Sequence, residues 1–280
     1  MAADSISRRT VLAATLAMSP AMMLGGRALA ADAPRGDELP VITTGFEHIG
    51  MVVPDVEQAT KFYSSVFNPD LQKEQNPPLR YYVMLGSGYI AIGSRPGVTD
   101  SKIDHYCTLV RGYNRELMTK TLAERGVVSG QRGVVPDPDG IGLQLIATPG
   151  GPGPTAVPGG RLVDVEPLVR PIGMDHIVLK VGDLQRSADF YRHFFNPAKA
   201  PGKGRLAFQA ADTLIVLRAT GAGETAGVER YAVRVAAFDH AKVSKGLTAL
   251  GAAPEPKSSG PVLRFRDPNG LGVELRAVRA

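Results

Sequence analysis

The sequence is poor in cysteine, in aromatic side chains and in excess charge of either sign. Cys107 is the single cysteine among 280 residues, so the chain can form neither an internal disulfide nor a cysteine-rich zinc site. Aromatic residues make up 6%, and 32 Lys and Arg stand against 27 Asp and Glu, a net charge of +5. Because nucleic-acid binding relies on basic surfaces and on aromatic side chains that stack on bases, this composition argues against a nucleic-acid partner.

The sequence also lacks an apolar run long enough to cross a membrane. Its N-terminal apolar stretch, residues 11–24, is too short for a bilayer core of about 30 Å. Arg8 and Arg9 directly precede this stretch, and small residues follow at 28–30. The segment resembles a twin-arginine signal peptide, which predicts a periplasmic protein exported after folding. We therefore expect a signal peptide at 1–30, a spacer at 31–43 and no membrane span in the mature protein.

A long repeat organises the rest of the chain. Four features recur 128 positions later: residues 47–53 at 175–181, Asp55 at Asp183, Phe62-Tyr63 at Phe190-Tyr191, and 67–69 at 195–197. Two more recur 130 positions later: Asp137-Pro138 as Asp267-Pro268, and Gln144 as Glu274. A collinear series of this kind indicates duplication. Residues 149–171, rich in proline and glycine, read as a linker. The sequence thus predicts two homologous domains, at 44–148 and 172–280.

Hydrophobic periodicity predicts the elements of each domain. In the first, alternation predicts a strand at 46–53, and apolar residues at helical spacing predict a helix that begins after Asp55 and ends at 68–69. Strands at 80–85 and 89–93 follow, joined by a turn at 86–88. A second unit has a strand at 103–110, a helix at 115–124 and a strand at 141–147. The fold class is therefore α+β, with four such units in the chain.

The motifs of these units resemble a known superfamily. A strand with a histidine before apolar residues, a helix with Phe-Tyr and a last strand introduced by Asp-Pro-Asx-Gly resemble the vicinal oxygen chelate (VOC) superfamily. Glyoxalase I, extradiol dioxygenases and bleomycin-resistance proteins belong to it. The resemblance implies βαβββ modules, paired so that their sheets form a cup around one divalent metal ion.

The resemblance also maps metal ligands onto the first domain. They are His48 on its first strand, His105 on the first strand of its second module and Gln144 on its last strand. Strand alternation supports a common direction, because Ile49 and Met51 must face a helix and thereby turn His48 toward the cup. Glutamine is a weaker donor than the carboxylate common in the family, so metal binding and a metal-free polar cleft both remain open.

The second domain departs further from the family pattern. His176 and Glu274 occupy the first and last ligand positions, but the middle position holds Arg230. A guanidinium stays protonated and has no lone pair for a metal. We expect Arg230 to pair with Glu274 inside the second cup. This charge pair would take the place of a metal ion, so a metal site is less expected there than in the first cup.

Other side chains are candidates for substrate contact or support. Tyr82, Cys107, Tyr113 and Arg230 are candidate substrate-binding residues. Asp104 could orient the neighbouring His105, but alternation predicts that adjacent strand residues point to opposite faces.

Two functions fit these features. One is a metal-dependent enzyme, a lyase, isomerase or extradiol-type dioxygenase, that uses Fe, Mn, Ni or Zn on a small substrate with neighbouring oxygens. The alternative is a binding protein of the bleomycin-resistance type that sequesters a small molecule without chemistry. The sequence does not predict an oligomeric state.

Overall fold

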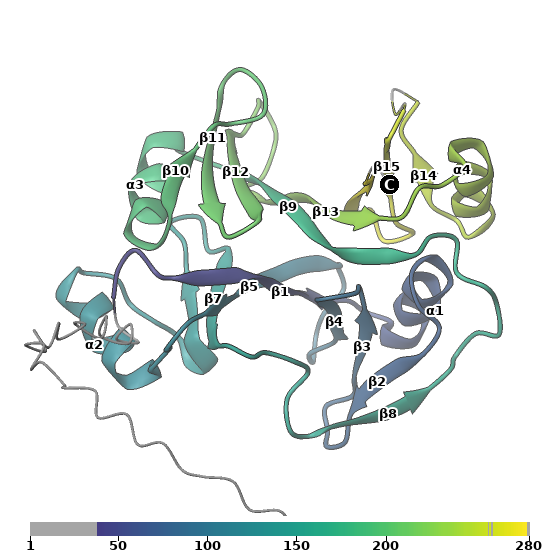
Figure 1. The fold of residues 1–280 in the computed structure, drawn as a ribbon, viewed down its shortest axis with the longest axis horizontal. Helices are drawn as coiled ribbons and strands as arrows, with labels where there is room; N and C mark the ends of the chain where they lie inside the picture. Colours follow the sequence, from purple (N-terminus) through teal and green to yellow (C-terminus); the bar gives the residue numbers. More distant parts are fainter. Residues whose placement is uncertain (1–37, 257, 259, 279–280) are drawn as a thin grey trace, which may run out of the picture. The chain divides into compact units, whose positions relative to one another are not determined.

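The computed structural model describes residues 38–256, 258 and 260–278, and the predicted signal peptide lies outside them. The first copy of the repeat forms one eight-stranded sheet in the order β6-β7-β5-β1-β4-β3-β2-β8 (Figure 1). Its elements are β1 (Thr43–Val52), α1 (Val56–Val66), β2 (Leu71–Glu74), β3 (Arg80–Met84), β4 (Tyr89–Gly93), β5 (Lys102–Val110), α2 (Arg115–Glu124), the 3-10 turn η1 (Gln131–Gly133), β6 (Val134–Pro136), β7 (Gly142–Ala147) and β8 (Ala156–Gly160).

The second copy forms another eight-stranded sheet, in the order β10-β11-β12-β9-β13-β16-β15-β14. Its elements are β9 (Pro171–Val181), α3 (Leu184–Phe194), β10 (Asn196–Ala198), β11 (Arg205–Ala210), β12 (Thr213–Ala219), β13 (Gly227–Val235), α4 (His240–Ala249), β14 (Ala253–Pro254), β15 (Val262–Arg266) and β16 (Gly272–Ala277).

In both sheets two modules join through their first strands. β1 pairs antiparallel with β5, and β9 pairs antiparallel with β13. On its other side each of these strands pairs in parallel with the last strand of its own module, as β1 does with β4 and β13 does with β16. This arrangement confirms the predicted α+β class and the pairing of modules.

The helices begin at the capping residues expected from their chemistry. Asp55, Asn114, Asp183 and Asp239 are the N-caps, and each side chain accepts a hydrogen bond from a backbone N–H of the first turn. Three strands of the first sheet, β2, β6 and β8, were not predicted from the sequence. β8 lies within the segment predicted as a linker and pairs with β2 at the edge of the first sheet.

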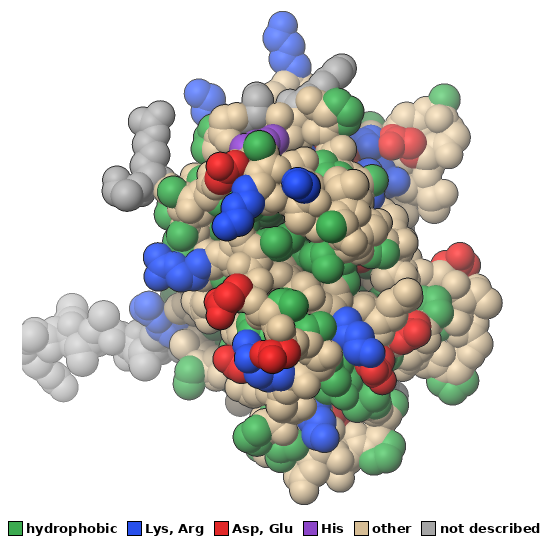
Figure 2. Space-filling model, turned by 90° about the vertical axis from the view of Figure 1, so that its right-hand side faces the viewer, with side chains coloured by type: hydrophobic (Ala, Val, Ile, Leu, Met, Phe, Trp, Pro, Cys, Tyr) green, Lys and Arg blue, Asp and Glu red, His purple; other side chains and the backbone are tan. Residues whose placement is uncertain are grey.

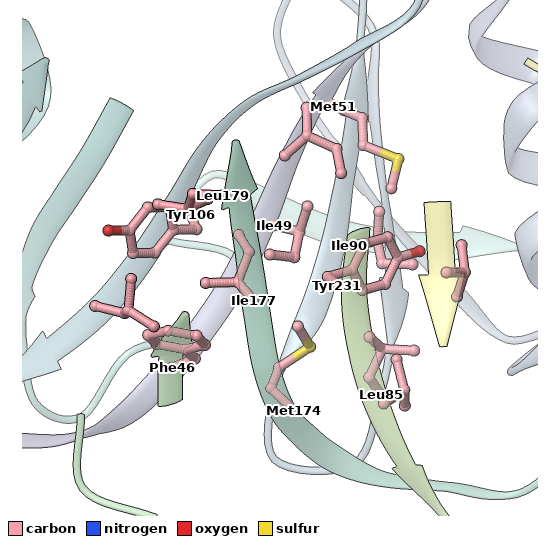
Figure 3. Close-up of a cluster of buried hydrophobic side chains, with 14 of the residues drawn as sticks. Phe46, Ile49, Met51, Leu85, Ile90, Tyr106, Met174, Ile177, Leu179 and Tyr231 are labelled. Carbon is pink, nitrogen blue, oxygen red and sulfur yellow. The ribbon is translucent and has the colours of Figure 1, made fainter. Parts of the chain in front are cut away.

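One apolar core lies between the two sheets. Ile49 and Met51 on β1 belong to the same buried cluster as Met174, Ile177 and Leu179 on β9 (Figure 3). The predicted partner of Ile49 and Met51 was a helix alone, and the structure adds the second sheet. We call the opposite face of the first sheet, which carries His48, the first cup. The second cup is the corresponding face of the second sheet, which carries His176.

Two reciprocal hydrogen bonds join the copies around this core. Tyr63 on α1 donates its hydroxyl to Asp267 Oδ2 at 2.7 Å, and Tyr191 on α3 donates to Asp137 Oδ2 at 3.0 Å. Each aspartate also accepts two backbone N–H groups of its own turn, at 2.7–2.9 Å. The Phe-Tyr and Asp-Pro motifs of the repeat therefore bind each other across the two copies.

The surface carries both signs of charge. On the face shown in Figure 2, Lys and Arg side chains are interspersed with Asp, Glu and apolar side chains. Among the residues that the structure describes, no helix combines the length and apolarity needed to cross a membrane.

The reciprocal pairs generate a stability prediction. Replacing Tyr63 or Tyr191 with Phe removes one donor from a buried aspartate, so we expect each variant to lose about 1.5–3 kcal/mol of unfolding free energy. Chemical denaturation measures this loss. The control is Tyr81→Phe on β3, a tyrosine that is only partly buried. We expect it to change stability by less than about 0.5 kcal/mol. If Tyr63→Phe and the control had the same unfolding free energy, the hydrogen bond between Tyr63 and Asp267 would not contribute to stability.

Candidate metal centre in the first cup

Four register shifts shape the two cups. The central ladders have six register shifts in all, and the four that concern the cups each leave out one acidic residue: Glu47 in β1, Asp104 in β5, Asp175 in β9 and Glu229 in β13. A β-bulge of this kind lets two consecutive side chains lie on one face of the sheet. The residue after the acidic one is His48, His105, His176 or Arg230. Each cup therefore receives two acid–base pairs from its central strands.

The first cup brings two imidazoles together. His48 Nε2 lies 3.1 Å from His105 Nε2, and the two rings meet edge to face with centroids 5.2 Å apart. His48 is buried, with an exposed fraction of 7%, and burial is the main reason that its pKa is lowered. At neutral pH this ring is therefore uncharged and has a lone pair to offer.

Glu47 holds the far side of the His48 ring. Its Oε2 lies 2.7 Å from His48 Nδ1 and accepts the hydroxyl of Tyr89 at 3.2 Å. Tyr89 stacks on the His48 ring with centroids 4.8 Å apart. The other carboxylate oxygen of Glu47 accepts the backbone N–H of Gly151, so the segment after β7 reaches into the cup.

Asp104 contacts the far side of the His105 ring, as Glu47 does for His48. The prediction that Asp104 and His105 point to opposite faces of the strand is therefore wrong. Asp104 Oδ2 lies 3.2 Å from His105 Nδ1. Because Asp104 is the extra residue of a bulge, it shares a face with His105 instead of pointing away. The hydrogen bond with His105 and the nearby Arg95 hold the pKa of Asp104 at about 2, so the carboxylate is charged.

Small residues make room for the His105 ring. Gly50 on β1 is the register partner of His105, and a Cβ there would overlap the imidazole. Gly142 on β7, its partner on the other side, would place a Cβ 2.8 Å from His105 Cβ. Both glycines are therefore required for His105 to lie across β1 toward His48.

Cys107 and Gln144 share one row with His48. The register pairs His48 with Cys107 and Cys107 with Gln144, so all three side chains project from the same face. Ligand atoms of Glu47, His48 and Cys107 lie within 4.8 Å of one another. Burial raises the pKa of the Cys107 thiol, which therefore stays protonated unless a cation binds it.

Gln144 does not touch the imidazoles through its amide nitrogen. Its Nε2 donates to the carbonyl oxygen of Arg132 in η1 at 2.8 Å, which leaves Oε1 as the acceptor of this amide. Of the predicted ligands, the structure thus joins His48 and His105 directly and places Gln144 on their face, one strand beyond Cys107.

The remaining candidate side chains lie at the edges of the cup. Tyr82 packs edge to face on Tyr89 with centroids 5.5 Å apart, and its hydroxyl donates to Glu74 at 3.1 Å. Tyr113 is partly buried, and its hydroxyl lies beside Gly133 in η1. Neither tyrosine has a hydrogen bond with a histidine among the described residues.

The second cup holds charge pairs where the first holds imidazoles. His176 Nδ1 lies 2.6 Å from Asp175 Oδ1, as in the other bulges. Arg230 forms ion pairs with Glu229 and, through Nε at 3.3 Å, with Glu274. The predicted pairing of Arg230 with Glu274 is confirmed.

Glu47 is a site residue that was not predicted from the sequence. The signal was present, because an acidic residue precedes the basic one at all four positions: Glu47-His48, Asp104-His105, Asp175-His176 and Glu229-Arg230. Alternation hid it, since a residue beside a histidine on a regular strand points to the opposite face.

The donor set of the first cup fits a cation. Carboxylates at both Nδ1 atoms favour Nδ1–H tautomers, so the two Nε2 lone pairs face each other at 3.1 Å. At this distance the two nitrogens need a positive charge between them, which either one shared proton or a metal ion supplies. One metal ion could contact both nitrogens at its usual distance of about 2.0–2.1 Å.

Solved structures with the same fold include metalloenzymes. No family model and no curated protein matches the sequence. The Mn(II)-bound glyoxalase from Novosphingobium aromaticivorans superposes with a TM-score of 0.59 at 15% identity, covering 86% of this chain and 83% of that one. The 2,3-dioxygenase LapB from Pseudomonas sp. KL28 gives 0.59 at 12% identity, covering 85% and 93%.

A third similar structure is a variant of homoprotocatechuate 2,3-dioxygenase from B. fuscum in complex with HPCA. It gives a TM-score of 0.61 at 13% identity and covers 89% of this chain and 74% of that one. The chain therefore has the fold of the glyoxalases and extradiol dioxygenases, the vicinal oxygen chelate fold that its sequence motifs predicted.

Proposed function

We propose that the chain is a metal-dependent enzyme whose first cup binds one divalent cation through His48 and His105. The observation that carries this proposal is the meeting of two Nε2 atoms at 3.1 Å, with a carboxylate behind each ring. Gln144 Oε1 and Cys107 Sγ are the further donors that the same face offers. The fold that the chain shares with a Mn(II)-bound glyoxalase and with a 2,3-dioxygenase supports this proposal.

The reaction class follows from the chemistry of such a centre. A divalent ion held by His48 and His105 would supply Lewis-acid chemistry toward a small substrate that presents two neighbouring oxygens. Isomerisation and elimination would need only this Lewis-acid chemistry, whereas extradiol-type ring opening would also need dioxygen as the oxidant and an ion such as iron that activates it.

The chain's own residues have separable parts in this function. Glu47 and Asp104 hold the Nδ1 protons of His48 and His105 and so keep the Nε2 lone pairs directed into the cup. Tyr89 stacks on His48 and shields this ring from water. Gly151 binds Glu47 and keeps its carboxylate in place.

Metal content tests the proposal directly. The purified chain, loaded with Mn(II), Fe(II) or Zn(II) and dialysed, should retain about one equivalent of metal. His48→Ala and His105→Ala should retain less than about a tenth of an equivalent, because each removes one of two converging nitrogens. His193→Ala on α3 and His176→Ala in the second cup are the matched controls and should retain the wild-type amount. Equal retention in His48→Ala and wild type would refute the centre.

A pair of isomeric probes tests the substrate class. Catechol has two neighbouring hydroxyls, and resorcinol has the same atoms with the hydroxyls one carbon further apart. Calorimetry should show catechol binding that needs the metal and that exceeds resorcinol binding at least tenfold, since only catechol can chelate. Metal-independent binding of both would favour the sequestration function instead.

The carboxylates behind the rings generate a third prediction. Asp104→Asn keeps the size of the side chain but removes the charge that fixes His105, so we expect the metal affinity to fall about 10–100-fold. Competition with a chelator of known affinity measures this. Asp100→Asn, at an exposed residue outside the cup, should leave the affinity unchanged. An unaltered affinity in Asp104→Asn would show that Asp104 does not support the centre.

A further inference from the structure

The second cup contains a pocket lined by four arginines. The pocket has a volume of about 280 Å³, and its charged lining consists of Arg205, Arg230, Arg264, Arg276, Asp175 and Glu274. Pockets for drug-sized ligands measure about 300–1,000 Å³, so this one suits a small molecule.

The carboxylate of Glu274, at the base of the pocket, pairs with three of these arginines. Its side chain is completely buried, and it accepts from Arg264 Nε at 2.7 Å and from Arg276 Nη2 at 2.6 Å. Arg230 Nε lies 3.3 Å away. Burial opposes ionisation of Glu274, but His176, Arg264 and Arg276 lower its pKa overall. The carboxylate is therefore charged and is already neutralised.

Positive charge remains after these pairs are counted. Four guanidinium groups and two carboxylates line the pocket, which leaves two positive charges in excess. Glu229, behind Arg230, is shared with Arg218, which also pairs with Glu224. Including these three groups still leaves one positive charge unbalanced.

Arg205 is the clearest unpaired cation. Within the described part of the chain it forms no ion pair, although it lines the pocket at the start of β11. Burial lowers the pKa of Arg230, Glu229 and Glu274 oppose this effect, and the charges of Arg264 and Arg205 add to it, so Arg205 lies close enough to Arg230 for their charges to interact.

The equivalent positions of the two cups explain why this one suits an anion. Arg230 stands where the first cup has His105, and Val178 stands where it has Gly50. The second cup thus lacks a second imidazole, and the side chain of Val178 fills the space on β9 that such a ring would need. It offers guanidinium groups, which bind carboxylates through two parallel hydrogen bonds.

The uncharged lining of the pocket selects among anions. Leu214 and Pro201 lie beside the arginines, and Leu214 packs on the apolar cluster of Val178, Ala207 and Val216. An inorganic anion would leave this apolar surface in contact with water, whereas an organic acid would cover it.

We infer that the second cup is a binding site for a small organic carboxylate, whose carboxylate pairs with Arg205 and Arg230 and whose apolar body lies on Leu214 and Pro201. The site needs no metal, and it is independent of the centre proposed for the first cup.

Calorimetry on the full chain tests the site with benzoate and hexanoate as probes. We expect saturable binding of one molecule per chain, at least tenfold tighter than binding of benzamide, which has the shape of benzoate without its charge, and of inorganic phosphate. The metal-free His48→Ala variant should bind these probes as the wild type does, so a failure of the first-cup centre and a failure of this site are distinguishable.

Arg205→Gln is the decisive variant. Because Arg205 has no ion pair to lose, the change leaves no carboxylate unpaired, and the thermal midpoint should stay within about 2 °C of wild type. Benzoate affinity should fall at least tenfold. Arg192→Gln on α3, an arginine paired only within its own helix, is the control and should bind as wild type. Absence of saturable binding, equal affinity for benzamide or phosphate, or unchanged affinity in Arg205→Gln would each overturn the proposal.

Discussion

An extra residue in each of the four central strands decides what the two cups contain. On a regular strand, Glu47 and His48 would point to opposite faces, and the carboxylate would lie in the apolar core. The bulge places both on the cup face, where the acid can bind the base next to it. The same device at Asp104, Asp175 and Glu229 gives every module an acid–base pair at its centre. Burial of so much charge in the middle of a sheet depends on this immediate pairing.

The same scaffold then supports two different chemistries. In the first cup, glycine at 50 lets His105 lie across β1 until its Nε2 meets that of His48. In the second, valine at 178 fills the corresponding place and Arg230 pairs with Glu229 and Glu274. The second cup thus differs from the first at three equivalent positions, with Arg230 for His105, Val178 for Gly50 and Glu274 for Gln144, and guanidinium donors replace one imidazole lone pair.

Much of this could be predicted from the sequence, for physical reasons. Apolar spacing predicted both helices of the first copy, and Asp55 predicted where α1 begins. The meeting of His48 and His105 was predictable because both belong to equivalent strands. The place of Asp104 was not, since alternation carries no sign of a bulge. Nor was the contact of Tyr63 with Asp267, because 204 positions separate them and each motif is also compatible with a role inside its own copy.

The segment that leads from the first copy to the second also contacts the first cup. β7 and β8 lie near opposite edges of the first sheet, so the chain between them must cross the strands that carry the site. It crosses at Gly150 and Gly151, where a Cβ on Gly150 would overlap the Glu47 carboxylate. Glycine at 150 is therefore needed for the approach, and Gly151 uses both of its backbone groups, donating to Glu47 and accepting from Tyr89. The residue that orients His48 is thus held by the same segment that leads to the second copy, so the geometry of the proposed centre depends on how the two halves of the chain are connected.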